Sequence, residues 1–233
     1  NSDLRRGKTT VNVAWSNSHG VLIGDFIYSK AFMLMNEIGN FKVIDELSSA
    51  TNKIAEGELM QLANKNNLNT SLQQLKKISY YKTGRLFEAS AKSAAMLSGK
   101  SIPFIENISK AAKLIGIAFQ VRDDLLDYGV SKGNIGKPEM QDILEDKITY
   151  PLYFALKYSN KKDSSKILKK LKNKDFSIEE VADFVSSSNA FNKCNSLIQN
   201  YNNEISKCIN QISNKEIRDE MLNLSESLKN RYE

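Results

Sequence analysis

The stretch of sequence that decides the fold runs from Ile105 to Tyr128 and is IENISKAAKLIGIAFQVRDDLLDY. Apolar side chains recur in it at steps of three and four residues, which is the spacing of one face of an α-helix. The same spacing recurs over residues 21–35, 44–59 and 72–97. Because the sequence contains no alternating apolar and polar segment longer than a few residues, it predicts an all-α fold.

Breaks rich in turn-forming residues separate these helices. Asn-rich residues 64–70 end one of them, and Gly- and Ser-rich residues 98–103 end another. Four Gly and Pro residues within ten positions mark residues 129–149 as a loop, after which a helix resumes near Pro151. The polar tail from Asn189 onward keeps an apolar stripe that predicts a packed surface helix. The chain has only three prolines, none in its first hundred residues, which favours long helices over a turn-rich β-sandwich.

Composition is that of an ordinary globular chain, with 41% hydrophobic and 26% charged residues in a total of 233. This length and the absence of an internal repeat favour a single domain over residues 1–233. The mean hydropathy is −0.42 and no run approaches 18 uncharged apolar residues, which excludes a transmembrane helix from the sequence, and the first residues lack the apolar segment of a signal peptide. Cys194 and Cys208 are too far apart on one helix for a disulfide, and His19 alone cannot form a zinc cluster. We therefore expect a reducing, cytoplasmic location.

The formal net charge is +6, which suits an anionic ligand, a nucleic acid or a membrane surface. Only six of the 33 basic residues are arginine, the residue preferred for bidentate contacts with phosphate and guanine. Many of the lysines lie in the polar stretch 161–174, which is typical of a solvated helix face. The sequence therefore favours a small anionic ligand over a nucleic acid.

Three carboxylates gather at the end of the helix quoted above. At about 100° per residue, Asp123, Asp124 and Asp127 all point to one side of the helix. Three like charges repel and raise one another's pKa, and a divalent cation relieves that repulsion. Mg²⁺ takes one or two carboxylates and completes its octahedron with water and substrate phosphates. The alternative is a solvated helix end, but the apolar helix before the acids and the lysine-bearing loop after them favour a metal site.

Two basic segments accompany these acids. Residues 129–147 carry glycines and well-spaced lysines, which predicts a mobile lid that brings positive charge to a metal-bound phosphate. Tyr81 to Gly84 place a lysine and a hydroxyl in the middle of an apolar helix. Lys82 there is either a snorkelling surface side chain or a ligand of a diphosphate.

Taken together, these segments resemble the trans-polyprenyl diphosphate synthase family, most closely its bacterial long-chain, octaprenyl-type branch. The matching blocks follow the family's order along the whole chain and comprise residues 3–8, 21–26, 55–58, 82–87, 119–127 and 136–151. The resemblance implies an isoprenoid-synthase helical bundle around a central cavity. It also implies Mg²⁺-dependent condensation of isopentenyl diphosphate with an allylic diphosphate, giving a long all-trans chain for quinone side chains. A homodimer, and transient membrane contact through the product, are further implications.

The resemblance also assigns roles to individual residues. Asp123, Asp124 and Asp127 match the second aspartate-rich motif, which holds Mg²⁺ against the allylic diphosphate. The residues that match contacts to that diphosphate are Arg5, Lys82, Thr83, Gln120, Lys137 and Lys147. Arg6 matches a contact to isopentenyl diphosphate. The residues expected to be catalytic are Asp123, Asp124, Lys82 and Lys137. Asp142 matches a loop acid, and residues 31–35 offer a candidate wall for the growing hydrocarbon chain.

One family element is absent from the sequence. The first aspartate-rich motif, expected immediately before Asn1, is not among the 233 residues, and neither are the upstream residues that hold isopentenyl diphosphate. We therefore expect the chain to be part of a longer polypeptide that carries the N-terminal helices. Two alternatives remain within the family: a synthase of farnesyl or geranylgeranyl length, and a non-catalytic subunit of a heteromeric synthase. The intact second motif argues against the second of these. A basic nucleic-acid module is the third alternative.

Overall fold

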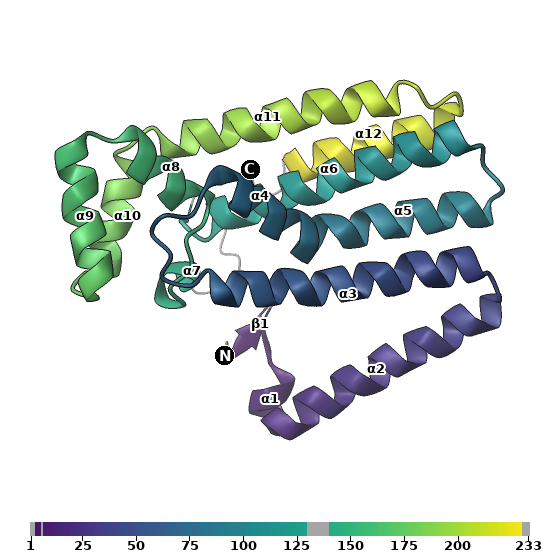
Figure 1. Cartoon of the computed structure of the whole chain (residues 1–233), viewed down its shortest axis with the longest axis horizontal. Coiled ribbons are helices and arrows are strands. Elements are labelled where there is room, and N and C mark those ends of the chain that lie inside the picture. Colours follow the sequence, from purple (N-terminus) through teal and green to yellow (C-terminus); the bar gives the residue numbers. More distant parts are fainter. Residues whose placement is uncertain (1–2, 6, 130–139, 230–233) are drawn as a thin grey trace.

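The fold is built around α6 (Ile102–Leu126), whose first turn contains Pro103 at a position that needs no backbone N–H. The computed structural model describes residues 3–5, 7–129 and 140–229. Most of the second half of α6 is buried, because neighbouring helices cover it on several sides. The helices packed around it are α5 (Arg85–Leu97), α11 (Ala190–Ile209) and α12 (Lys215–Lys229) (Figure 1). The all-α prediction is confirmed.

A second layer continues from α5 toward the N-terminus. It contains α3 (Phe41–Ala63), which packs against α5, and the short helix α4 (Leu72–Ser79). Beyond α3 lies α2 (Asn17–Ile38), which diverges from the bundle toward α1 (Val11–Ala14) (Figure 1). The chain begins with two paired two-residue strands, β1 (Leu4–Arg5) and β2 (Lys8–Thr9), which are antiparallel.

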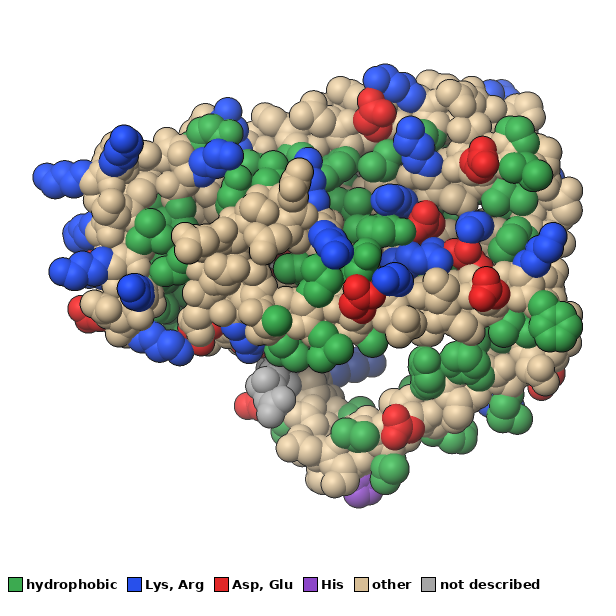
Figure 2. Space-filling model, in the orientation of Figure 1, with side chains coloured by type: hydrophobic (Ala, Val, Ile, Leu, Met, Phe, Trp, Pro, Cys, Tyr) green, Lys and Arg blue, Asp and Glu red, His purple; other side chains and the backbone are tan. Residues whose placement is uncertain are grey.

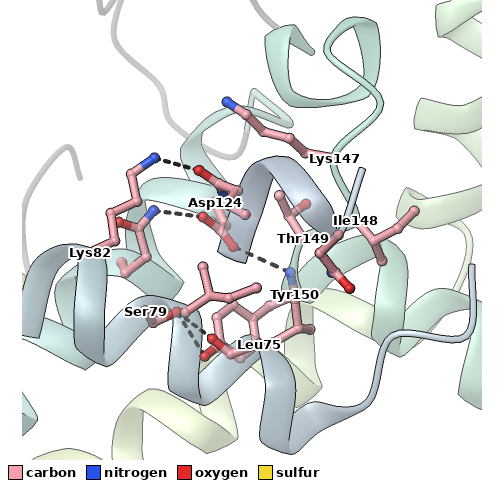
Figure 3. A pocket seen from close by; sticks show the side chains of 12 residues that line it. Leu75, Ser79, Lys82, Asp124, Lys147, Ile148, Thr149 and Tyr150 are labelled. Atoms are coloured by element: carbon pink, nitrogen blue, oxygen red, sulfur yellow. Dashed lines mark hydrogen bonds between the residues drawn. The ribbon is translucent and has the colours of Figure 1, made fainter. Parts of the chain in front are cut away.

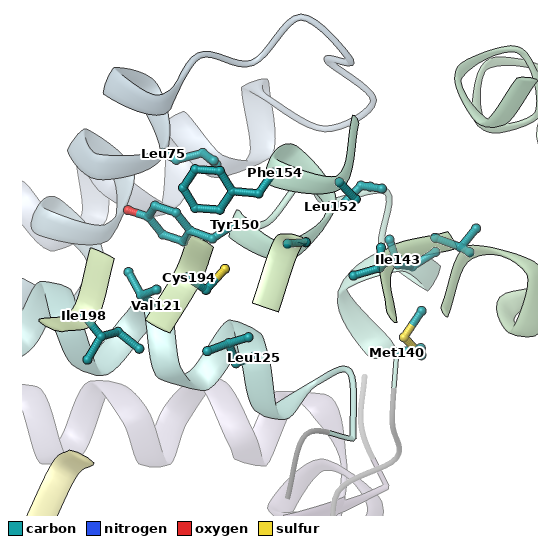
Figure 4. Close-up of a cluster of buried hydrophobic side chains, with 14 residues drawn as sticks. Leu75, Val121, Leu125, Met140, Ile143, Tyr150, Leu152, Phe154, Cys194 and Ile198 are labelled. Carbon is teal, nitrogen blue, oxygen red and sulfur yellow. The ribbon is translucent and has the colours of Figure 1, made fainter. Parts of the chain in front are cut away.

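Four shorter helices close one end of the bundle. They are α7 (Gln141–Leu144), α8 (Tyr150–Tyr158), α9 (Lys161–Asn173) and α10 (Ile178–Ser186). The largest buried cluster lies here, where α6 meets α8 and α11 (Figure 4). Tyr150, Val121 and Cys194 are all fully buried in it, so this end of α6 is held firmly from several directions.

The boundaries differ from the sequence predictions in three places. The predicted helix 72–97 is divided by η1 (Tyr80–Gly84), a π-helical turn. The polar tail forms two helices, α11 and α12, instead of one. The prediction of a mobile loop over 129–147 is wrong for its second part, because α7 begins directly after Met140 and contains Ile143, and both residues are buried in the core. The first part of that loop, residues 130–139, lies outside the described residues.

Two further sequence predictions concern the cysteines and a membrane span. Cys194 and Cys208 are both buried on α11 as free thiols. None of the helices that the structure describes combines the length and hydropathy that a membrane span requires.

The surface of α2 is unusual because none of its residues is buried. Large hydrophobic side chains stand exposed along it, and Figure 2 shows them facing outward and toward the gap beside α3. The more than half-exposed ones are Val21, Leu22, Phe26, Ile27, Tyr28, Met33, Leu34 and Ile38.

Candidate active site

Three glycines let the helices around the site approach more closely than any larger residue would allow. A Cβ atom on Gly116 of α6 would lie 2.6 Å from the Cα atom of Gly84. A Cβ atom on Gly57 of α3 would lie 2.7 Å from the backbone nitrogen of Lys82. Both separations are far inside the contact distance of about 3.5–4.0 Å between carbon atoms. The glycines therefore bring α3, η1 and α6 into backbone contact and fix the position of Lys82.

The π-turn η1 directs its two polar side chains to different helices. A π-turn inserts an extra residue into a helix and is frequent at functional sites. Lys82 points toward α3, where its Nζ donates a hydrogen bond of 2.7 Å to Gln61 and lies 3.3 Å from the Glu58 carboxylate. The Thr83 hydroxyl donates to Oε1 of Gln120 on α6 at 2.8 Å. Lys82 is thus ion-paired and three-quarters buried, unlike a snorkelling surface lysine.

A line of hydrogen bonds continues from Thr83 into the core (Figure 3). The Nε2 atom of Gln120 donates to Oδ1 of Asp124 at 2.9 Å. The other oxygen of Asp124 accepts the backbone N–H of Tyr150 at 3.3 Å. The hydroxyl of Tyr150 in turn lies 3.0 Å from the hydroxyl of Ser79 on α4. Asp124 is therefore oriented directly by groups of α6 and α8, which are in turn held by η1 and α4.

Asp124 is only 6% exposed, and its environment disfavours a negative charge. Burial raises the pKa of Asp124 well above its ordinary value, and the nearby charge of Asp142 raises it further. The hydrogen bonds from Gln120 and from the backbone of Tyr150 act in the opposite direction without cancelling the effect. A positive charge brought to this site would be stabilised by the carboxylate that it allows to ionise.

Asp127 binds the backbone of residues 140–142. Its two carboxylate oxygens accept the N–H groups of Gln141 at 3.1 Å and Asp142 at 3.0 Å. Its own carbonyl accepts the N–H of Met140 at 2.7 Å. These contacts satisfy the free N–H groups at the start of α7, so buried Asp127 anchors the segment that carries Asp142 and Lys147.

Lys147 brings a second cation to the same region. Its Nζ lies 2.6 Å from Glu145 and 3.2 Å from Asp142. Burial opposes the charged form, but hydrogen bonding to Glu145 and the charge of Asp142 outweigh it and raise the pKa of Lys147. Lys147 is therefore a cation at neutral pH. Asp123, one residue before Asp124, is half-buried and its carboxylate accepts no hydrogen bond from the residues that the structure describes.

Four of the residues predicted from the sequence line one small cavity. They are Lys82, Gln120, Asp124 and Lys147, and the cavity holds about 20 Å³, which is roughly the room of one water molecule. The remaining walls include Gln61, Ser79 and Tyr150. Asp123 and Asp127 do not belong to its described lining, although both lie within one helical turn of Asp124 on the chain.

The residues present fit a magnesium ion that is held partly by phosphate. Within the described residues, no three His, Cys, Asp or Glu side chains form a ready-made metal cage. Asp124 and Asp127 direct their oxygens at N–H donors, whereas the carboxylate of Asp123 is available. Mg²⁺ needs only one or two carboxylates when water and substrate phosphates fill its other positions. This donor set therefore suits Mg²⁺ bound together with a diphosphate.

Besides Asp123 and Asp127, four predicted residues are not in the described lining of the cavity: Thr83, Lys137, Arg6 and Arg5. Lys137 and Arg6 lie outside the described residues, and Arg5 is described only as part of β1. Gln61 and Glu58, the partners of Lys82, could not be assigned a role from the sequence. Their spacing of three residues places them on one face of a helix. This spacing indicates a shared site only once that face is known to meet η1.

The comparison with protein families is decisive for the class of the protein. Residues 1–190 match the family model described as polyprenyl synthetase. The chain belongs to the polyprenyl synthetase family.

Individual relatives agree with this class. The chain is 40% identical over 166 residues to the octaprenyl diphosphate synthase of Escherichia coli, a match that covers 71% of this chain and 51% of that protein. It is 35% identical over 194 residues to the geranyl-diphosphate-specific all-trans-nonaprenyl-diphosphate synthase of Rhodobacter capsulatus, covering 83% and 59% of the two chains. The chain thus spans between about half and three-fifths of the length of these relatives.

The fold agrees with a solved structure as well. The polyprenyl synthase of Caulobacter crescentus, crystallised with calcium and isoprenyl diphosphate, superposes with a TM-score of 0.92 at 28% identity. That match covers 100% of this chain and 72% of the other. The predicted isoprenoid-synthase type of bundle is confirmed.

Proposed function

We propose that the polypeptide containing this chain condenses isopentenyl diphosphate with an allylic diphosphate, in a Mg²⁺-dependent reaction that yields a long all-trans polyprenyl diphosphate. The observation that carries the proposal is the single cavity that gathers Lys82, Gln120, Asp124 and Lys147. Relatives named as octaprenyl and nonaprenyl synthases support the long product. A long chain of this kind suits a quinone side chain, and its release implies transient contact of the cytoplasmic enzyme with a membrane.

Lys82 and Lys147 are the groups that bind the diphosphate in this proposal. Each is ion-paired in the structure, Lys82 with Glu58 and Lys147 with Asp142 and Glu145. These ion pairs keep two cations at the cavity, and an incoming diphosphate exchanges one set of anionic partners for another. Thr83 and Gln120 stand beside Lys82 with polar groups that reach the same anion. Lys137 keeps its predicted role as a third cation.

Asp123 would hold the Mg²⁺ ion, and when bound that ion supplies charge neutralisation to the diphosphate leaving group. Asp124 and Asp127 support the site without a direct bond to the ion in this proposal. Asp124 adds negative charge from the core, and Asp127 keeps α7 in place. The relative crystallised with calcium and isoprenyl diphosphate supports a divalent cation beside a diphosphate in this family.

The reaction needs no nucleophilic side chain. The allylic C–O bond breaks with its electron pair leaving on the diphosphate, and Lys82 and Lys147 stabilise the charge that develops there. The double bond of isopentenyl diphosphate attacks the allylic carbon, and the released diphosphate takes the proton whose loss restores an alkene. The chain's own residues therefore bind, orient and neutralise.

The hydrocarbon part of the substrate requires an apolar path. Phe87 lies one helical turn beyond Thr83 and lines an apolar cavity of about 370 Å³ between α5, α6 and α12. The wall predicted at residues 31–35 is open on one side, because Met33 and Leu34 are 55% and 51% exposed. A second surface is needed to complete it.

We propose a second copy of the chain as that surface. Exposed apolar side chains occur along the whole length of α2, and a monomer would leave them in water (Figure 2). Covering such side chains favours association of two copies. In the dimer, α2 would be buried on both of its sides.

Product analysis with the whole polypeptide tests the proposed function. Purified protein is incubated with labelled isopentenyl diphosphate, an allylic diphosphate and Mg²⁺, and the dephosphorylated products are separated by reversed-phase chromatography. We expect products of octaprenyl length and none after chelation of the metal. Products that stop at farnesyl or geranylgeranyl length would move the protein to the shorter-chain branch. Activity only after a second, different subunit is added would identify a non-catalytic partner.

A further inference from the structure

A second cavity, of about 280 Å³, lies beside the candidate active site. Three separate segments enclose it: residues 66–68, the segment 143–152, and residues 171–176 at the end of α9. Its floor is apolar and includes Leu68, Leu171 and Phe176. Its volume is close to the lower end of the range for small-molecule sites in proteins, which is about 300 Å³.

The backbone around this cavity is strained at three points. Asn66, Asp146 and Lys174 have φ angles of 57°, 60° and 54°, which are left-handed conformations that favour glycine. Only one other non-glycine residue in the described part of the chain, Met140, shares this conformation. Strain of this kind concentrates at functional sites, where the surrounding structure enforces it.

Asp146 ties the three segments together. Its carbonyl accepts the backbone N–H of Asn66 at 2.9 Å, and its carboxylate lies 2.9 Å from Nζ of Lys174. This pairing lowers the pKa of Asp146, so its carboxylate is ionised at neutral pH. The three segments around the cavity are therefore joined by hydrogen bonds and an ion pair, so the cavity is not a gap left between loosely packed loops.

The polar rim of the cavity is positive. Lys147, Lys172 and Lys174 all belong to its lining, and Asp146 is the one acid among the described lining residues. Lys172 is exposed and forms no ion pair with another residue that the structure describes. An apolar floor beneath a lysine rim matches a ligand with a hydrocarbon body and one anionic group.

The cavity also shares a wall with the candidate active site. Lys147 and Ile148 line both cavities, whereas their other lining residues are different. A ligand that draws the Lys147 ammonium toward the second cavity takes a cation away from the first. We propose that the second cavity is a ligand site for a short-chain phosphate monoester and that its occupation alters the position of Lys147. The binding stands by itself, and only its effect on turnover rests on the proposed function.

Titration of the whole polypeptide with hexyl phosphate tests the binding. Isothermal calorimetry compares hexyl phosphate with inorganic phosphate and with hexanol, which each carry half of the ligand's chemistry. We expect hexyl phosphate to bind to one site at least about tenfold more tightly than either, because both halves are needed. Equal binding of hexyl phosphate and inorganic phosphate would overturn the proposal.

Matched variants locate the bound molecule. Lys172→Gln removes a rim charge, and Lys169→Gln removes an exposed charge from the same helix outside the cavity lining. We expect Lys172→Gln to weaken hexyl phosphate binding about fivefold and Lys169→Gln to change it less than about twofold. Equal losses in both variants would show nonspecific attraction to the basic helix and refute the site.

Methyl resonances provide a location that does not depend on a variant. We expect hexyl phosphate to shift the signals of Leu68 and Leu171 in the second cavity, and not that of Ile78, which lines only the first. Shifts confined to Ile78 would mean binding in the candidate active site and would overturn the proposal. Because these measurements need no turnover, they remain informative even if the polypeptide has no transferase activity.

Discussion

Replacing Gly116 by alanine should damage the bundle although alanine is the better helix former. The new Cβ atom would lie 2.6 Å from the Cα atom of Gly84 and 3.2 Å from the Cβ atom of Phe87. Non-bonded carbon atoms in contact are about 3.5–4.0 Å apart, so η1 and α6 must separate by about 1 Å. Since the obstacle is backbone and cannot rotate away, the strain should cost about 2–3 kcal/mol.

The intrinsic preference for alanine offsets part of this strain. Alanine is favoured over glycine inside a helix by about 1 kcal/mol, which leaves a net loss of about 1–2 kcal/mol in the free energy of unfolding. Gly24 of α2 is the matched control, because its Cβ position meets no heavy atom within 4 Å. Gly24→Ala should therefore stabilise the protein by up to about 1 kcal/mol.

Urea denaturation of the two variants and the wild type, followed by far-ultraviolet circular dichroism, measures both changes. We predict that the free energy of unfolding falls in Gly116→Ala and rises in Gly24→Ala. If Gly116→Ala were as stable as the wild type, the close contact between α6 and η1 would not hold the site together. A lower transferase activity of Gly116→Ala is also expected, because Gln120 lies one turn further along α6 and would move away from Thr83.

Three further outcomes follow from the buried charges and from α2. Glu46 is 7% exposed and pairs with Arg85 and Lys92. In Glu46→Ala, buried Arg85 would keep Glu88 as its one described acidic partner. We therefore expect urea denaturation to show a loss of about 3 kcal/mol in the free energy of unfolding. Burial opposes ionisation of Glu46, but these partners outweigh it and lower its pKa below 4.5. The contribution of Glu46 to the free energy of unfolding is therefore complete above about pH 4.5 and is lost as the pH falls through the pKa of Glu46 in the folded protein. Urea denaturation at a series of acidic pH values should show this loss in the wild type and not in Glu46→Gln. Asp127→Ala should cost about 1–2 kcal/mol and increase amide exchange at Gln141 and Asp142, whereas unchanged exchange would argue against the anchoring role. Phe26→Glu should convert a dimer to a monomer in light scattering at micromolar concentration, and a wild type that is already monomeric would refute the dimer.

Helix α6 and its acidic end could be predicted from the sequence because both depend on local spacing. The apolar period of residues 105–128 fixes the buried face, and the same helix carries Gln120, Asp123 and Asp124. Of the residues predicted to share one site, Lys82, Gln120, Lys147 and Asp124 line one cavity, whereas Asp123 and Asp127 are not in its described lining. These residues come from separate segments, and it is the resemblance to a family, not periodicity, that connected them.

Other features depend on contacts that no local pattern reveals. The close packing of η1 against α3 and α6 depends on Gly57 and Gly116, and a single sequence does not show which glycines meet another backbone. The backbone contacts of Asp127 were not predicted, because its oxygens bind N–H groups fourteen and fifteen residues further along the chain. The second part of the loop was predicted to be mobile because its charges are conspicuous, whereas Met140 and Ile143 anchor it in the core.

The most direct test of the central claim is the activity of Asp123→Ala in the whole polypeptide, compared with Asp45→Ala, an exposed acid on α3. The account predicts that Asp123→Ala abolishes Mg²⁺-dependent condensation, because the diphosphate loses a group that holds its neutralising cation, while Asp45→Ala retains it. Thermal stability without metal should not fall in Asp123→Ala, since removing one of several neighbouring acids relieves repulsion. Near-normal turnover of Asp123→Ala would contradict this role and show that Asp123 holds no cation that the reaction needs.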